Sequence, residues 1–116
     1  MRAIPIIACG LALASSTAFA QVGFHSGGSL LASCEDPALR PECTQYIAGV
    51  ADAHGYDLSR FGSPRDFCTP EDITIEELER IVVKWLKDHP EKLRVTAANL
   101  VLLAFVDEFK CKGDRD

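Results

Sequence analysis

The sequence has little of what nucleic-acid binding requires. It contains 12 Lys and Arg against 17 Asp and Glu, a net charge of −5, and no segment gathers the basic residues that phosphate binding needs. We therefore exclude nucleic acid and anionic lipid as partners. The acidic balance favours either a basic protein partner or no more than solubility. Residues 21–116 also contain no internal repeat and no low-complexity segment.

Histidine is equally scarce, and its placement argues against metal or catalytic chemistry. No two of His25, His54 and His89 have the i, i+4 spacing that places two ligands on one helix face. Asp52, His54 and Asp57 come nearest to a ligand set, yet a histidine near a helix C-terminus needs no other role. A catalytic cysteine would need a free thiolate beside a histidine. We predict no enzyme activity, no metal and no cofactor.

A long apolar run is also missing, because the N-terminal one is too short for the roughly 20 residues of a membrane span. Met1 and Arg2 form a basic start, residues 3–13 are apolar, and Ala18-Phe19-Ala20 is a small-x-small cleavage site. This order predicts a signal peptide, residues 1–20, that is removed after Ala20. Ile6-Ile7-Ala8-Cys9 resembles a lipobox, but we expect Cys9 to be removed with the signal peptide. Residues 21–116 then form one domain in the periplasm.

Four of the five cysteines remain after cleavage, and in an oxidising compartment an even number predicts two disulfides. Sequence alone allows three pairings. Helix lengths favour Cys68 with Cys111, because an antiparallel return of the last helix brings Cys111 near the start of the helix before it. Cys34 would then pair with Cys43.

Hydrophobic periodicity predicts an all-α fold, a small bundle of four to five helices, and no strand. The clearest helix has a capping box formed by Thr74 and Glu77, and an apolar stripe that places Trp85 in the core. Gly55 is expected to end the second helix and Pro90 to begin the last. The expected helices are 26–34, 41–54, 74–87 and 90–109.

The segment from Leu100 to Val106 is apolar on every face of the expected helix. Such a helix is covered all round by protein. Two arrangements provide that cover: a central position in the bundle, or a homodimer interface. Both can hold together.

Residues 56–70 lack a helical period and are rich in Gly, Ser, Pro and charge. A loop of this length is uncommon in a compact domain and is often functional. The alternative is a connector that a disulfide fixes in place. The two interpretations remain open.

An acidic run accompanies the start of the third helix. Carboxylates at a helix N-terminus complement the helix dipole, which is the interpretation we favour. A basic partner protein is the alternative. The run consists of Glu71, Asp72, Glu76, Glu77 and Glu79.

Several motifs together resemble the Rap/Tai immunity proteins of type VI secretion systems. They are Phe24-x-Ser26-Gly27-x-x-Leu30-Leu31-x-x-Cys34, Cys43-x-x-Tyr46-Ile47-x-Gly49-Val50-x-Asp52-Ala53, Phe67-Cys68-x-Pro70 with Ile73-Thr74, Leu86-x-x-His89-Pro90, Ala97-Ala98-x-Leu100-Val101 and Phe109-x-Cys111. The resemblance covers nearly all of residues 21–116. The chain departs from the family pattern at its end, where Lys110 replaces an expected proline.

The resemblance implies a periplasmic helical protein, similar in shape to the HdeA-type acid chaperones, that dimerises. Such a protein blocks a cognate cell-wall amidase effector and does no chemistry itself. Occlusion needs a rigid projecting element, because ordering a flexible loop weakens binding. We therefore expect Tyr56, Arg60, Phe61 and Arg65, whose residue types often anchor interfaces, to contact the effector. The alternative function is that of an HdeA-like periplasmic acid-stress chaperone.

Overall fold

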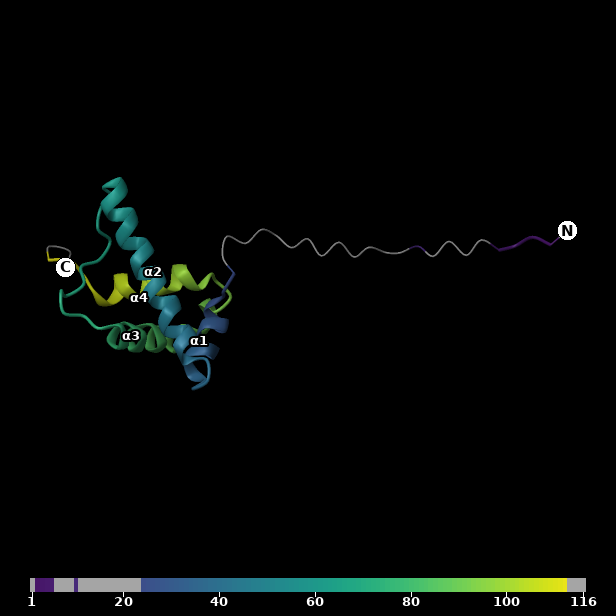
Figure 1. Ribbon diagram of the computed structural model, residues 1–116, viewed down its shortest axis with the longest axis horizontal. Coiled ribbons are helices and arrows are strands. Elements are labelled where there is room, and N and C mark those ends of the chain that lie inside the picture. The colour runs from purple at the N-terminus through teal and green to yellow at the C-terminus, as the bar shows by residue number, and fades with distance from the viewer. Residues whose placement is uncertain (1, 6–9, 11–23, 113–116) are drawn as a thin grey trace.

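The computed structural model describes residues 2–5, 10 and 24–112. Their helices, in chain order, are α1 (Gly27–Glu35), α2 (Arg40–Phe61), α3 (Ile75–Asp88), the 3₁₀ turn η1 (Pro90–Lys92) and α4 (Ala97–Glu108). α3 and α4 lie side by side and run in opposite directions, and α2 crosses them (Figure 1). The predicted all-α fold is confirmed, and the described residues contain no strand.

Most of the expected signal peptide, residues 1–20, and its cleavage point lie outside the described residues. Within the described part of the chain, no helix combines the length and the apolar character needed to cross a membrane.

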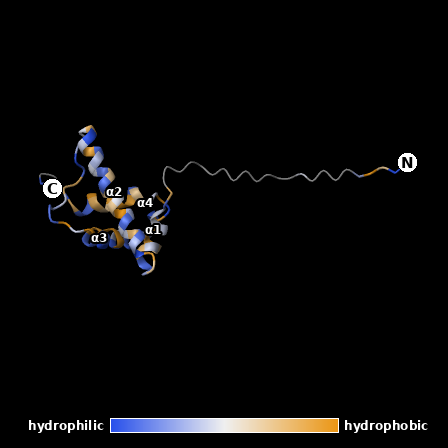
Figure 2. Ribbon diagram, viewed as in Figure 1, coloured by the Kyte–Doolittle hydropathy of each residue, from blue (hydrophilic) through white to orange (hydrophobic). Residues whose placement is uncertain are grey.

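α4 supplies the centre of the core. Leu100, Val101 and Phe105 are almost completely buried, and Ile47 of α2 and Val82 of α3 pack in the same cluster. Figure 2 shows α4 as the most consistently apolar helix, whereas α2 and α3 mix apolar with hydrophilic residues. Burial of each large apolar side chain stabilises the fold by roughly 1.5–3 kcal/mol.

α4 is nevertheless not buried on every face. The expectation that the segment from Leu100 to Val106 is covered all round is therefore wrong for a single chain. Leu103 is 42% exposed, and Leu102 and Val106 are only partly buried. α1, α2 and α3 all contact α4, and the face of α4 that carries Leu103 is the exposed one.

α3 forms as predicted. The Thr74 side chain accepts a hydrogen bond from the Glu77 backbone N–H at 3.2 Å, and the Glu77 carboxylate accepts one from the Thr74 N–H at 3.1 Å. This capping box satisfies two backbone donors that the first turn leaves free. Trp85 is buried in the core, where its indole N–H donates to Asp107 at 2.7 Å.

The last helix is shorter than predicted: η1 and a break replace its first two turns. The break has a tertiary cause, because the backbone at the start of α1 forms hydrogen bonds with the backbone of this segment. Gly27 N–H donates to Val95 C=O at 2.9 Å, and Ala97 N–H donates to the His25 C=O at 2.8 Å. A Cβ atom on Gly27 would collide with the end of the Leu100 side chain, so a larger residue here would require Leu100 to move.

α2 is longer than predicted, and Gly55 does not end it. The helix continues to Phe61 and ends at Gly62, whose φ of 62° is left-handed. A glycine inside a helix costs about 1 kcal/mol but does not break the hydrogen-bond ladder. Of the expected loop 56–70, residues 56–61 are therefore helical, and residues 62–74 form the actual connection to α3.

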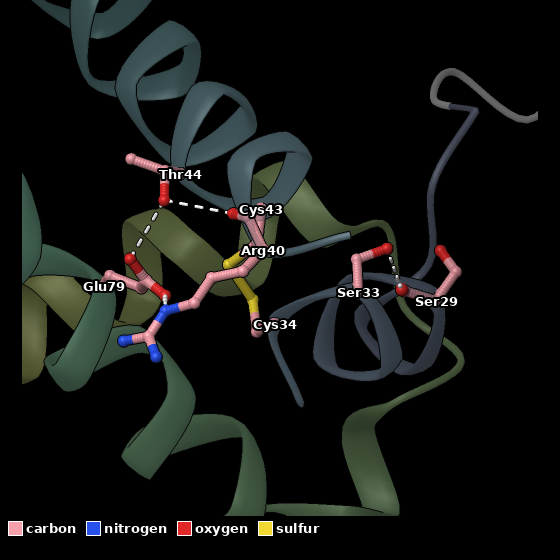
Figure 3. The surroundings of a disulfide bond; sticks show 7 residues. All are labelled: Ser29, Ser33, Cys34, Arg40, Cys43, Thr44 and Glu79. Atoms are coloured by element: carbon pink, nitrogen blue, oxygen red, sulfur yellow. Dashed lines mark hydrogen bonds and ion pairs between the residues drawn. A yellow bond between two sulfur atoms is a disulfide. The ribbon is translucent and has the colours of Figure 1, made fainter. Parts of the chain in front are cut away.

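The two disulfides join Cys34 to Cys43 and Cys68 to Cys111, the pairing that the sequence favours. The first fastens α1 to the start of α2 (Figure 3). The second fastens the connection before α3 to the end of α4, where the Cys68 N–H also donates to the Phe109 C=O at 2.8 Å.

The buried carboxylate of Glu79 provides a third link, which joins α3 to the start of α2. Glu79 of α3 accepts hydrogen bonds from Arg40 and from the Thr44 hydroxyl, both at 3.0 Å. Figure 3 shows these side chains converging from α2 onto Glu79 beside the Cys34–Cys43 bridge. A buried charge is tolerated when it is paired and hydrogen-bonded in this way.

Candidate partner-binding surface

The end of α2 projects beyond the body of the protein (Figure 1). Leu58 is the only side chain of residues 55–61 that is partly buried, and the others in this range are exposed. The helix has 22 residues and therefore spans about 33 Å, longer than the roughly 21 Å of the 14-residue α3 against which it packs.

Three of the four predicted contact residues lie together on this projection. The rings of Tyr56 and Phe61 meet edge to face, with centroids 6.4 Å apart, and the Arg60 guanidinium carbon lies 5.6 Å from the Phe61 centroid. Tyr56 is 60% exposed and Phe61 is 68% exposed. We call these three residues the α2 tip. Their mutual contacts favour one arrangement, which reduces the entropy lost on binding a partner.

Arg65 does not belong to the helix that carries the α2 tip and lies in the connection to α3. It lines a cavity of about 320 Å³ together with His54, Phe67 and Leu78. The sequence placed all four contact residues on one loop. The structure places three on a helix and the fourth on the segment that returns to the body.

His54 packs against the connection between α2 and α3. Its ring stacks on Phe67 with centroids 4.8 Å apart, and Phe67 in turn packs against Phe105 at 5.6 Å. The His54 Nε2 atom is buried and has no hydrogen-bond partner among the described residues. Among all the residues that the structure describes, no three His, Cys, Asp or Glu side chains lie close enough together to hold a metal ion.

The acidic run is divided among different roles. Glu79 is buried and pairs with the exposed Arg40, and Glu77 completes the capping box. Asp72 and Glu77 line a groove between α3 and α4 that also receives Asp107 and Glu108 from the end of α4. Sequence reasoning missed these last two carboxylates, because only the folded chain brings them beside the run.

One ion pair lies at an end of this groove. Lys84 donates to Asp88 at 2.7 Å, and this hydrogen bond lowers the pKa of Asp88 and raises the pKa of Lys84. Both groups are exposed, so the pair contributes little to stability.

An apolar groove of about 350 Å³ lies between α2 and α4. Small residues line it beside larger ones, among them Gly49, Val50, Ala53, Ala98 and Leu102. Tyr46 also lines this groove, and partial burial raises the pKa of its phenol. Small side chains allow the backbone of another helix to come close.

The family described as Rap1a immunity proteins matches residues 26–111 of the chain. The match begins at the N-cap of α1 and ends at the last cysteine of the Cys68–Cys111 bridge. No curated protein and no solved structure matches the chain.

Proposed function

The chain belongs to the Rap1a immunity protein family, and from that premise we propose that it binds and occludes a cognate peptidoglycan amidase effector of a type VI secretion system. The producing cell would thereby be protected from the toxin of its neighbours. The protein would work without catalytic chemistry and without a cofactor.

The α2 tip is the observation that supports occlusion. Tyr56 and Phe61 expose large apolar surfaces at the end of a helix, and Arg60 adds a cation beside them. Tyr and Arg are enriched at the energetic centres of interfaces. A helix is already ordered before binding, so little binding energy is lost in ordering it.

The start of α2 supports this role, because it makes the projection rigid. The Cys34–Cys43 bridge and the Glu79 contacts with Arg40 and Thr44 hold the first turns of the helix in the body. A projecting helix that is fixed at one end enters a cleft as a preformed element.

Two properties of the chain support a periplasmic location. The predicted signal peptide directs export, and the two disulfides form and persist in an oxidising compartment. We propose removal of residues 1–20, which leaves a helical domain of residues 21–116.

We also propose a homodimer, with a second copy on the side of α4 that the chain leaves open. Leu103 is exposed there, and Leu102 lines the apolar groove between α2 and α4. A sedimentation-equilibrium mass equal to one chain at micromolar concentration would contradict this assembly.

The functional test needs a candidate effector, to be sought as an exported amidase in the reading frames that neighbour this gene. Wild-type protein should bind this toxin and restore growth of cells that export it. Tyr56→Ala combined with Phe61→Ala should weaken binding by about 30-fold or more, because truncation of an interface anchor costs about 2 kcal/mol or more. Leu39→Ala combined with Val95→Ala removes exposed apolar surface elsewhere and is the matched control.

Full protection by the tip variant would show that the α2 tip makes no essential contact. An absence of protection by the wild-type protein would overturn the proposed function itself. An acid chaperone would instead lose its dimer at low pH and keep a client protein soluble, which light scattering detects.

A further inference from the structure

The groove between α3 and α4 has the form of a binding surface. Its volume is about 700 Å³. The partly exposed Ile73 and Ile81 supply apolar surface along it, and the buried rings of Trp85 and Phe109 also line it. Trp85 is held in place by its hydrogen bond to Asp107 at 2.7 Å and by stacking on His89, with ring centroids 3.9 Å apart. The groove therefore offers a preformed apolar floor.

Its rim is acidic. Five carboxylates and two cations line the groove, a difference of −3, and the two cations are Arg80 and Lys84. The carboxylates are Asp72, Glu77, Asp88, Asp107 and Glu108. Among the described residues that line it, only Lys84 and Asp88 form an ion pair. The other carboxylates create a negative potential that the groove itself does not neutralise.

Asp107 serves the fold by accepting a hydrogen bond from the Trp85 N–H, but the helix dipole favours neither Asp107 nor Glu108. Both lie in the last turn of α4, where the helix dipole is negative, and this turn contains no basic residue. A negative charge at a helix C-terminus is unfavourable, whereas Glu76 and Glu77 at the start of α3 are favourable. Helix capping explains the acidic start of α3 but not the acidic end of α4.

We propose that this groove binds a cationic segment of a partner protein, which places an apolar side chain on Ile73 and Ile81 and its Lys or Arg residues against the rim carboxylates. The apolar floor distinguishes such a segment from a bare metal ion, and no three of the described acidic, histidine or cysteine side chains converge as ligands. The acidic rim repels nucleic acid. The attribution of this segment to the amidase effector rests on the proposed function.

A pair of labelled peptides tests the groove without the effector. The probes are fluorescein-labelled Lys-Leu-Arg-Leu-Lys-Leu and its acidic counterpart Glu-Leu-Glu-Leu-Glu-Leu, and fluorescence anisotropy measures their binding to the mature protein. The basic peptide should bind, with an affinity that falls as salt is added, and the acidic peptide should not. Equal binding of the two peptides, or no binding of either, would overturn the proposal.

Charge reversal on the rim locates the binding. Asp72→Lys combined with Glu108→Lys should raise the Kd for the basic peptide at least about tenfold. Asp52→Lys, an exposed carboxylate outside the groove, is the matched control and should change the Kd less than about twofold. An unchanged Kd in the double variant would overturn the proposal.

A stability measurement accompanies the binding measurement, because a damaged fold would also lose the peptide. Glu108→Lys places a cation at the negative end of α4, so the midpoint of thermal unfolding should rise while peptide binding falls. A fall in both would mean that Glu108 serves the fold, and would overturn its role in binding.

The same variants then test the effector. Weaker toxin binding by the double variant, with toxin binding unchanged in Asp52→Lys, supports placement of the segment on the effector. Loss of the peptide without loss of toxin binding would overturn that placement. Failure of the wild-type protein to bind the toxin would overturn the proposed function and leave the peptide result unaffected.

Discussion

The two halves of α2 belong to one helix, yet the rest of the protein holds them very differently. Cys43 and Ile47 in the first half are completely buried, and Cys43 is linked covalently to α1. In the second half, Tyr56 and Phe61 are mostly exposed, and its contacts with the rest of the protein come from partly buried residues such as Ala51 and His54. The first half therefore provides stability, and the second half is available for binding.

This difference shows how a small protein presents a rigid contact surface without a large core. Helix formation is cooperative, so a half that is fixed by packing extends its order into a half that is not. Residues on the free half can be chosen for a partner at little cost to the fold.

The largest expected difference between the halves comes from Ile47 and Phe61. Ile47→Ala should lower the free energy of unfolding by about 2–5 kcal/mol, because it leaves a cavity in the core. Phe61→Ala should change it by less than about 0.5 kcal/mol, as is usual for exposed positions. Urea unfolding of the two variants measures both values. Comparable losses would contradict the division of α2 into a held and a free half.

The bridge at the start of α2 should rank next. Cys34→Ala combined with Cys43→Ala opens a loop of roughly ten residues, and the chain-entropy estimate of the loss is about 2.7 kcal/mol. Urea unfolding of the double variant against wild type, both under non-reducing conditions, measures it. A loss below about 1 kcal/mol would mean that Glu79 and the core fix this end of α2 without the covalent link.

The two glycines of the free half should give the smallest effects, with opposite signs. Gly55→Ala should stabilise the protein by about 0.5–1 kcal/mol, because alanine favours the helix interior and no heavy atom lies within 4 Å of the added Cβ. Gly62→Ala should destabilise it by about 1 kcal/mol, because Gly62 has a left-handed φ of 62°. Thermal unfolding detects both shifts. Destabilisation by Gly55→Ala would indicate that the helix ends before the tip.

Local signals in the sequence account for what could be predicted. Thr74, Glu77 and the apolar stripe that follows them specify α3 within a few residues, and Ser26 begins α1 in the same way. The errors arose where a local signal was weak. Gly55 resembled a helix end, yet the helix continued to a second glycine, Gly62, that takes the left-handed conformation.

The candidate surfaces were harder to predict than the helices. Tyr56, Arg60 and Phe61 could be selected by residue type, but their helical presentation depended on where α2 ends. The acidic groove could not be assembled from the sequence, since Asp72 and Glu108 are far apart in the chain and meet only after α3 and α4 pack.

The sequence by itself determined the helical class, the capping box of α3, the acidic charge and the presence of four bridging cysteines, because each depends on neighbouring residues or on composition. Only the tertiary structure decided where α4 begins and which carboxylates share a groove. The backbone bonds of His25 and Gly27 with Ala97 and Val95 form between segments that are distant in sequence. Their effect on α4 exists only after the chain has folded.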